Sequence, residues 1–247
     1  MNNKKVADVL TEFILKKVEP FEGVVIGMSG GIDSAVVAKL CADAIGPENM
    51  LSVVMPAYDE SVKSQNHYDA LEWSHALNLE TNVFCLNDTL KVLDGHRITF
   101  IDKLVEGNIT ARLRMIVLYA YANKMNRLVA GTTNKSEAMV GYYTKWGDGA
   151  VDFEPIIDLY KTEVRELARY LGVPEKIITK SPTADLWKGQ TDEDELGMSY
   201  AVLDEYLKGH QPTNDVEAEV YNRVQQMIRN SEHKRVMPDG PNLGGIK

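Results

Sequence analysis

A short segment near the start of the chain has residue types that suit the binding of phosphate groups. It reads Gly27-Met28-Ser29-Gly30-Gly31-Ile32-Asp33-Ser34 and lies where a β-branched run gives way to helical composition. Adjacent glycines let the backbone approach an oxyanion closely, while hydroxyl groups and the first turn of a helix add hydrogen-bond donors. A carboxylate in such a cradle suits a cation that accompanies the anion. Asp33 is therefore a candidate Mg²⁺ ligand.

Other interpretations of this segment are a simple glycine-rich turn, with Asp33 as a helix cap, and two different nucleotide-binding loops. A Walker A loop requires Gly-Lys followed by Ser or Thr, and the dinucleotide-binding fingerprint requires Gly-x-Gly-x-x-Gly. Neither pattern occurs in the segment. The order of its residues therefore argues against a P-loop kinase and against a dehydrogenase.

The run SGGIDS, from Ser29 to Ser34, resembles the SGGxDS loop of the ATP pyrophosphatases, which split ATP between its α and β phosphates. Alone, this loop leaves open GMP synthetase, argininosuccinate synthetase, asparagine synthetase and tRNA-modifying enzymes. Seven further segments narrow the choice, and together they closely resemble ammonia-dependent NAD synthetase. They are GNITARLRM from Gly107, AGTTNKSE from Ala130, GYYTKWGDGAVDFEPI from Gly141, DLYKTEVRELARYLGVP from Asp158, SPTADLW from Ser181, QTDEDELG from Gln190 and EHKR from Glu232.

This resemblance implies an enzyme that amidates deamido-NAD with ammonia and yields NAD, AMP and pyrophosphate through an acyl-adenylate. It implies ATP as cosubstrate, Mg²⁺ as cofactor and a homodimer as the assembly. The nearest alternative substrate is nicotinic acid mononucleotide, which has the same reacting ring. A noncatalytic nucleotide-binding protein of the same fold is an alternative of another class, although such a protein needs no pair of metal-binding carboxylates.

The resemblance also implies roles for individual residues. Asp33 and Glu137 would bind Mg²⁺. ATP would contact Gly27, Met28, Ser29, Gly30, Gly31, Ile32, Asp33, Ser34, Thr132, Lys161 and Thr183. Deamido-NAD would contact Arg112, Lys145, Asp152, His233 and Lys234. Since ammonia must be neutral to attack, a nearby carboxylate would help by deprotonating ammonium, and Asp148 is the candidate for that catalytic base.

Several of these residues have plainer interpretations. Glu137 suits an exposed helical position, Asp148 suits a Gly-Asp-Gly turn, and EHKR suits a solvated run of charges. Arg112 and Arg114 are two apart in a helical segment, so at most one is expected to face a shared pocket. Lys161 begins a helix, where a cation is slightly unfavourable, and an anionic partner would explain it better.

Two other groups of residues are interpreted as structural. The acidic residues 192–195 follow Thr191 and suit the positive end of a helix dipole, so they need no catalytic role. The aromatic residues at 142, 143 and 146 could stack on a ligand ring, but aromatic side chains more often serve packing. Neither group is expected to belong to the site.

Alternating strand and helix patterns must position all of these residues. Apolar runs predict strands at 23–29 and near Leu51, Thr81 and Arg127, with those near Leu51 and Thr81 buried. Helical patterns extend over 6–18, 33–44, 108–125 and 160–171. The alternation predicts an α/β fold with a doubly wound, mostly parallel sheet flanked by helices. The resemblance implies its Rossmann-like, adenine nucleotide α-hydrolase form.

Length and composition set the remaining expectations. Residues 1–247 are expected to form a single NAD synthetase domain without a glutaminase domain, and 236–247 a flexible tail. The 27 basic and 36 acidic side chains give a net charge of -9, which disfavours binding to nucleic acid. Cys41 and Cys85 lack the spacing of a metal or redox pair and are expected to be buried. Without an apolar run long enough for a signal or a membrane span, the expected compartment is the cytoplasm.

Overall fold

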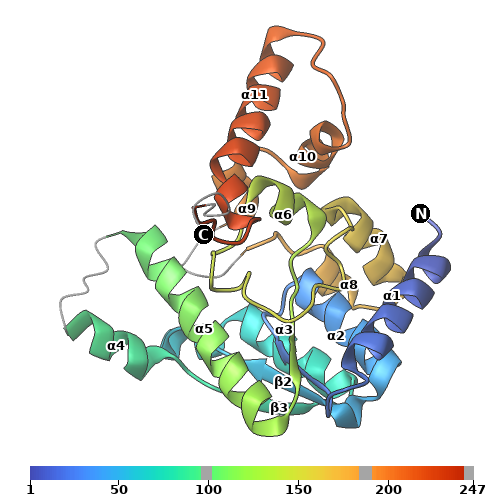
Figure 1. Cartoon of the computed structure of the whole chain (residues 1–247), viewed down its shortest axis with the longest axis vertical. Coiled ribbons are helices and arrows are strands. Elements are labelled where there is room, and N and C mark those ends of the chain that lie inside the picture. The colour runs from blue at the N-terminus through green and yellow to red at the C-terminus, as the bar shows by residue number, and fades with distance from the viewer. Residues whose placement is uncertain (96–101, 184–190, 242–247) are drawn as a thin grey trace.

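The computed structural model describes residues 1–95, 102–183 and 191–241 (Figure 1). Within these residues the chain forms one sheet of four parallel strands in the order β3-β2-β1-β4. The strands are β1 Val24–Gly27, β2 Met50–Val54, β3 Glu80–Val83 and β4 Leu128–Ala130. The reversal of strand order beside β1 is the place where open α/β sheets bind ligands, outside the carboxyl ends of their strands.

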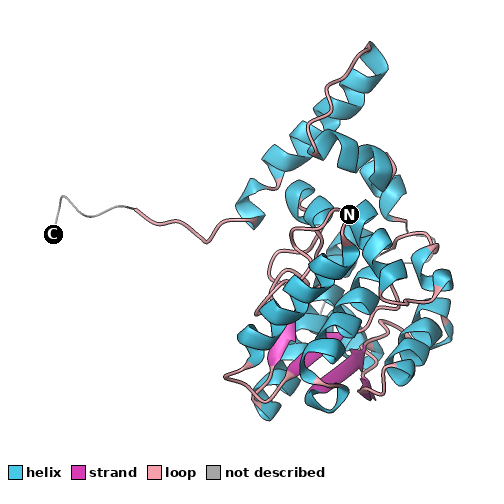
Figure 2. Ribbon diagram, turned by 90° about the vertical axis from the view of Figure 1, so that its right-hand side faces the viewer, coloured by secondary structure: helices cyan, strands magenta, loops and turns pink. Residues whose placement is uncertain are grey.

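Helices connect the strands and cover both faces of the sheet (Figures 1 and 2). The α-helices are α1 Asn3–Val18, α2 Ile32–Ile45, α3 Gln65–Ala76, α4 Asn87–Gly95, α5 Lys103–Met125, α6 Lys135–Val140, α7 Lys161–Tyr170, α8 Glu175–Ile178, α9 Asp192–Leu196, α10 Tyr200–Leu207 and α11 Asp215–Asn230. Short 3₁₀ turns are η1 Pro47–Asn49, η2 Asp59–Lys63 and η3 Glu232–Lys234.

Alternate side chains of each strand face opposite layers, as strand geometry requires. Val24 and Ile26 of β1 pack into the larger core, which α1, α2 and α7 complete. Val25, between them, packs with Leu51 and Val129 against α5 on the other face. The predicted α/β fold with a doubly wound parallel sheet is confirmed.

The strand near Thr81 was expected to be buried, and that expectation is wrong. β3 lies at the edge of the sheet, its side chains are only partly covered, and Val83 is 50% exposed. Cys85, just beyond it, is likewise partly exposed, whereas Cys41 in α2 is buried as expected. An apolar run alone does not reveal whether a strand has neighbours on both sides.

The long helix α5 begins earlier than the predicted start at 108. Its N-cap is Asp102, whose side chain accepts a hydrogen bond from the Leu104 amide at 2.8 Å. The helix ends at Met125, followed by Asn126 in the left-handed conformation that commonly terminates a helix. The extra turn adds Leu104 to the lining of the main cavity.

A second, smaller core holds the last helices. Tyr200 and Leu203 of α10 and Val224 of α11 pack with Val140 of α6 and Leu196 of α9. In Figure 1, α10 and α11 rise as a hairpin above the sheet layer.

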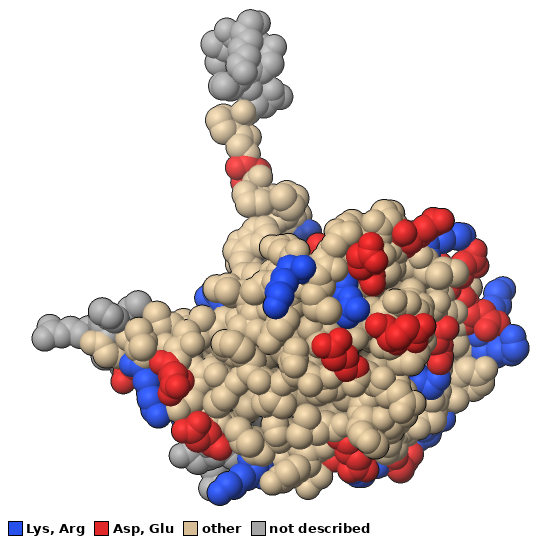
Figure 3. Space-filling view, turned by 90° about the horizontal axis from the view of Figure 1, so that it is seen from below, with Lys and Arg blue, Asp and Glu red and all other residues tan. Residues whose placement is uncertain are grey.

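Seen from below, the molecule has a broad area without charged side chains (Figure 3). No helix in the described part of the chain is long and apolar enough to cross a membrane.

Candidate active site

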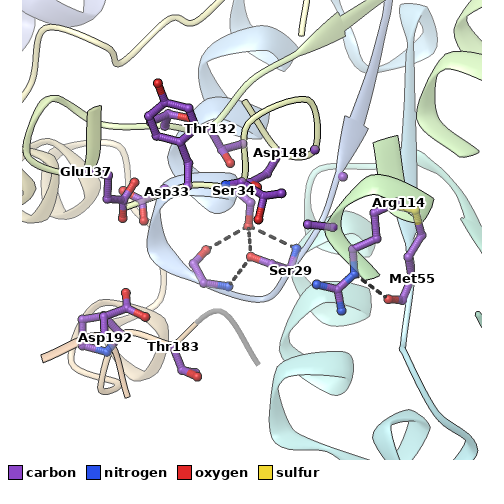
Figure 4. A pocket seen from close by; sticks show the side chains of 18 of the residues that line it. Ser29, Asp33, Ser34, Met55, Arg114, Thr132, Glu137, Asp148, Thr183 and Asp192 are labelled. Atoms are coloured by element: carbon purple, nitrogen blue, oxygen red, sulfur yellow. Dashed lines mark hydrogen bonds between the residues drawn. The ribbon is translucent and has the colours of Figure 1, made fainter. Parts of the chain in front are cut away.

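The carboxyl ends of β1, β2 and β4 open into a cavity of about 470 Å³. The segment 27–34 lines it with every residue except Gly30, which is buried behind the loop. Thr132 follows β4, and Thr183 and Asp192 enter from the opposite side (Figure 4). The topological switch point thus gathers residues that the sequence had placed far apart.

Hydroxyl groups hold the shape of residues 29–34, which we call the phosphate loop. Ser34 Oγ donates to the Gly31 carbonyl at 3.0 Å and lies 3.0 Å from Ser29 Oγ. The Gly31 amide donates in turn to Ser29 Oγ at 3.2 Å. Gly31 is also the N-cap of α2, so the positive end of that helix faces the same cavity. This arrangement presents backbone amides and hydroxyl groups to an anion.

Asp33 and Glu137, the two predicted metal ligands, come together around Lys161. The Lys161 ammonium lies 2.5 Å from Asp33 Oδ2 and 3.1 Å from Glu137 Oε1, and the lysine side chain is only 3% exposed. Asn134 caps α6 through the Glu137 amide and donates to Asp33 Oδ1 at 3.1 Å. The anionic partner expected for Lys161 is therefore this pair of carboxylates. Glu137 is not the exposed helical glutamate of its plainer interpretation.

The charges of this cluster shift its titration. Burial raises the pKa of Glu137 to about 7, and repulsion from Asp33 and Asp192 adds to the shift, while Lys161 opposes it. Burial lowers the pKa of Lys161, but the attraction of Asp33 and Glu137 outweighs it and raises the pKa overall. The amine therefore stays charged. Three carboxyl groups surround one ammonium group, so the cluster gains net negative charge as they ionise, which suits a further cation.

Asp192 belongs to this cluster, although the sequence suggested only a role at a helix start. Thr191 and Asp194 provide the cap of α9, whereas Asp192 is 5% exposed and lines the cavity. The hydroxyl oxygens of Tyr142 and Tyr200 each lie 3.2 Å from its carboxylate. Tyr200 also lies 3.2 Å from Glu137. A signal existed in the sequence, because Asp192 shares a helix face with the apolar Leu196.

Four of the five residues expected to contact deamido-NAD form a group beside the cavity. Arg112 Nη2 donates to the Lys145 carbonyl at 3.2 Å, and the Lys145 ammonium donates to the His233 carbonyl. Lys234 lines the cavity and donates to the Gly141 and Tyr143 carbonyls at 2.7 and 2.6 Å. The plainer interpretation of EHKR as a solvated run of charges therefore fails at Lys234, which fixes the loop after α6.

Asp152, the fifth residue, lies apart from this group. Its carboxylate accepts from the Val129 amide at 2.7 Å and from the Tyr119 hydroxyl at 3.2 Å. These contacts tie it to β4 and α5, and it does not line the cavity.

The two arginines of α5 diverge, as their spacing predicted. Arg114 lines the cavity and donates from Nε to the Met55 carbonyl at 3.2 Å (Figure 4). Arg112 is exposed and faces Lys145 outside the cavity wall. Their spacing did not decide which arginine would enter, because both positions are polar breaks in an apolar run, and the resemblance had pointed to Arg112.

Asp148 lines the cavity and also shapes its own turn. Its carboxylate accepts from the Thr144 amide at 2.8 Å. Although the residue is exposed as a whole, the protein packed around its carboxyl group disfavours the charged form and raises its pKa. The Thr144 hydrogen bond and the charges of Lys234 and Arg114 oppose that shift.

A family model described as NAD synthase matches residues 4–238 of the chain. The chain belongs to the NAD synthase family. Its similarity to an NH(3)-dependent NAD(+) synthetase of Archaeoglobus fulgidus is 48% identity, covering 96% of both chains.

Solved structures of the same fold agree with this assignment. An NMN synthetase from Francisella tularensis has a TM-score of 0.89 and 38% identity, covering 98% of this chain and 99% of the other. An NH3-dependent NAD synthetase from Campylobacter jejuni has a TM-score of 0.80 and 34% identity, covering 98% of this chain and 100% of the other. The resemblance to NAD synthetase read from the sequence is confirmed.

The cavity of this NAD synthase family member also has residues that the interpretation of the sequence left out of the site, among them Tyr142 and Asp192, which it had assigned to packing and to a helix start. Arg114, Lys180, Asp192 and Tyr142 line the cavity, and Tyr200 and Asn134 support it from behind. Among the residues that the structure describes, no three His, Cys, Asp or Glu side chains lie close enough to hold a metal ion by themselves. The cluster at Lys161 therefore offers two or fewer carboxylates to one ion.

Proposed function

We propose that this chain amidates deamido-NAD with ammonia, consuming ATP and releasing NAD, AMP and pyrophosphate. The observation that carries the proposal is the convergence of the loop 29–34, Asp33, Glu137 and Lys161 on one cavity. The curated relatives at 43 to 48% identity bear the name NH(3)-dependent NAD(+) synthetase, which supports the same reaction here.

Activation of the carboxylate explains the need for ATP. A carboxylate is a poor acyl donor, because its leaving group would be oxide. In the proposed reaction the nicotinate carboxylate attacks the α-phosphorus of ATP, the α–β bridge breaks, and pyrophosphate leaves into the loop 29–34. The loop amides, Ser29, Ser34 and Lys161 would hold the phosphates so that two anions can approach each other. Thr132 and Thr183, which line the cavity, would contact the nucleotide.

The residues present fit a Mg²⁺ ion. Asp33 and Glu137 are hard oxygen donors held around one buried cation, and a magnesium ion commonly takes only one or two carboxylates, completing its shell with phosphate oxygens and water. When bound, the ion would neutralise charge on the departing pyrophosphate. Asp33 and Glu137 would hold that ion, and Lys161 would then turn from these carboxylates toward the phosphates.

The second step needs neutral ammonia at the acyl carbonyl, where its attack forms the amide and releases AMP. Asp148 is the proposed base, because its carboxyl group lies in the cavity with a raised pKa and accepts protons more readily than an ordinary aspartate. The acid dinucleotide is proposed to bind Arg112, Lys145, Asp152, His233 and Lys234, and all of these except Asp152 lie together beside the cavity.

Nicotinic acid mononucleotide is a second candidate substrate. The Francisella tularensis protein named NMN synthetase matches this chain with a TM-score of 0.89, above the 0.80 of the NAD synthetase from Campylobacter jejuni. The chemistry at the carboxylate is the same for both acids. Turnover of each acid, measured side by side at equal concentration, distinguishes the two candidate substrates. A preference for the mononucleotide would mean that NAD is not the product, although the mechanism would stay the same.

We further propose that the chain acts as a homodimer through α5. This helix covers one face of the sheet and exposes apolar side chains of its own, with Ile116 at 57% and Val105 at 45%. Burying such side chains against a second copy removes apolar surface from water. Sedimentation equilibrium tests this, and a monomer at micromolar concentration would contradict it.

The central experiment follows the products of ATP. Incubation with ATP, magnesium, ammonia and deamido-NAD should release AMP and pyrophosphate in equal amounts, and omission of either ammonia or the acid should stop NAD formation. ADP as the spent nucleotide would overturn the proposed function. A protein that binds ATP without any turnover would favour the noncatalytic alternative.

A further inference from the structure

We propose that Lys180 is a positioning residue that holds the phosphate loop in its binding conformation by clamping the Gly30 carbonyl to α3. The inference rests on the proposed function, in which this loop binds the pyrophosphate released from ATP. Lys180 lies at the cavity wall, three residues before Thr183, and so joins two segments proposed to contact ATP.

The contacts of Lys180 are specific and largely screened from water. Its ammonium donates to the Gly30 carbonyl at 2.7 Å and to Asp69 Oδ2 at 2.7 Å. The Lys180 side chain is 20% exposed and that of Asp69 only 2%. Burial disfavours the charged form of Asp69, but hydrogen bonds from Lys180 and Gln65 outweigh it and lower its pKa. Asp69 is thus a buried anion that fixes the lysine.

Gly30 is the residue of the loop whose conformation most needs such support. It has φ +76°, and a Cβ at this position would lie 2.1 Å from the Asn66 carbonyl oxygen in the first turn of α3. The loop is therefore wedged against α3 with no space to spare. Gly30 alone of the segment 27–34 does not line the cavity, and its buried carbonyl is bound by Lys180.

The direction of this carbonyl matters for an anion site. A carbonyl oxygen turned into the cavity would repel phosphate, whereas a carbonyl bound by an ammonium group is held away from it. The same peptide unit carries the Gly31 amide, which donates to Ser29 Oγ. A charged donor on the carbonyl polarises this peptide and strengthens its amide as a donor. Lys180 therefore orients the peptide between Gly30 and Gly31 and strengthens the hydrogen bond that holds the Ser29 hydroxyl in the loop.

Lys176 provides a matched control. It lies in α8, four residues before Lys180, and its ammonium is 3.3 Å from the other carboxylate oxygen of Asp69. It does not contact the loop, and its side chain is 44% exposed. Removing either lysine takes one cation from Asp69. Only the removal of Lys180 frees the Gly30 carbonyl.

The test compares Lys180→Met, Lys180→Arg and Lys176→Met with the wild type. Calorimetry with magnesium pyrophosphate measures the affinity of the loop directly, and initial rates give KM for ATP and for deamido-NAD. We expect Lys180→Met to weaken pyrophosphate binding and raise KM for ATP about tenfold, the loss of about 1.4 kcal/mol. KM for deamido-NAD should change less than about twofold. Lys180→Arg, which keeps a cationic donor, should recover most of the affinity.

Two results would overturn the inference while leaving the proposed function intact. One is an equal loss of pyrophosphate affinity in Lys180→Met and Lys176→Met. The other is wild-type pyrophosphate affinity in Lys180→Met with only a lowered melting temperature. The proposed function fails on a separate result, the release of ADP by the wild-type protein.

Discussion

The ammonium group of Lys161 lies 2.5 Å from a carboxylate oxygen of Asp33, across 128 residues of sequence. Lys161 opens α7 and Asp33 lies in the first turn of α2, so the pair joins two helices that pack on the same face of the sheet. Since the lysine side chain is 3% exposed, this contact is a buried ion pair. Each charge has lost most of its water and is compensated by the other. The loss of either partner would therefore leave an uncompensated buried charge.

Replacing Lys161 by Met should destabilise the protein strongly when no magnesium is present. Asp33 and Glu137 would be left without their shared cation, and breaking a buried pair costs about 3 kcal/mol or more. Urea denaturation in EDTA measures the loss, and millimolar magnesium should restore part of it by supplying another cation. Lys135→Met is the control, because its pair with Asp158 is exposed and contributes less than about 1 kcal/mol. Equal stability of the two variants would contradict the prediction.

Gly30→Ala should be more destabilising than Gly172→Ala, although both glycines have φ +76°. An alanine at either position carries the strain of the left-handed region, about 1 kcal/mol. At Gly172 the new methyl group meets nothing within 4 Å, whereas at Gly30 it would collide with the Asn66 carbonyl at 2.1 Å. The expected extra loss of about 2 kcal/mol is measured by urea denaturation. A difference below about 0.5 kcal/mol would mean that the loop relaxes freely.

The site could be predicted from the sequence where its residues are neighbours in the chain. Phosphate binding by the loop 29–34 could be predicted from six residues, because a strand, a glycine pair and a helix start follow one another there. The cluster of Lys161, Asp33 and Glu137 required the resemblance to a family, since no local pattern links a helix start to a distant loop. Asp192 lies one turn before the apolar Leu196, which is a signal that it faces inward, but its place in an acidic helix start favoured a capping role instead.

The fold could also be predicted where a pattern is local in the sequence, and the prediction failed where a feature depends on distant neighbours. Buried strands such as β1 and β2 are apolar along their length, and their helical connections carry clear periodicity. β3 is exposed because it lies at the edge of the sheet. The residues of a strand do not themselves show whether it has a neighbour on both sides. The C-terminal hairpin of α10 and α11 likewise gains its core from α6 and α9.

Glu154 should make the stability of the protein fall as pH rises. Burial raises the pKa of this carboxyl group to about 8, although hydrogen bonds from Thr133 oppose the shift. An acid with a raised pKa binds its proton more tightly in the folded state, so its contribution is present at low pH and is lost between about pH 4.5 and 8. Glu154→Gln should remove the contribution of this residue and be more stable than wild type at pH 8 by up to about 4 kcal/mol. Parallel stability curves for the two proteins would refute it.

Arg112→Ala should weaken binding of deamido-NAD without affecting ATP. The guanidinium is exposed beside Lys145 and His233 and lies outside the cavity that holds the phosphate loop. We expect KM for the acid dinucleotide to rise about tenfold, the loss of one charge-assisted contact, with kcat and KM for ATP nearly constant. Arg229→Ala, on the exposed side of α11, is the control for a nonspecific change of charge. An unchanged KM for deamido-NAD in Arg112→Ala would remove this residue from the site.

Asp148→Asn should slow the attack by ammonia while leaving adenylate formation intact. The amide side chain can still accept the hydrogen bond from the Thr144 amide, so the turn is preserved, but it cannot take a proton from ammonium. A single-turnover experiment should show pyrophosphate release at the wild-type rate and NAD formation about a hundredfold slower. Raising the pH should narrow the gap, because a larger fraction of the ammonia is then already neutral. If NAD formation keeps pace with pyrophosphate release at pH 7 in this variant, Asp148 has no part in the proton transfer and serves the turn alone.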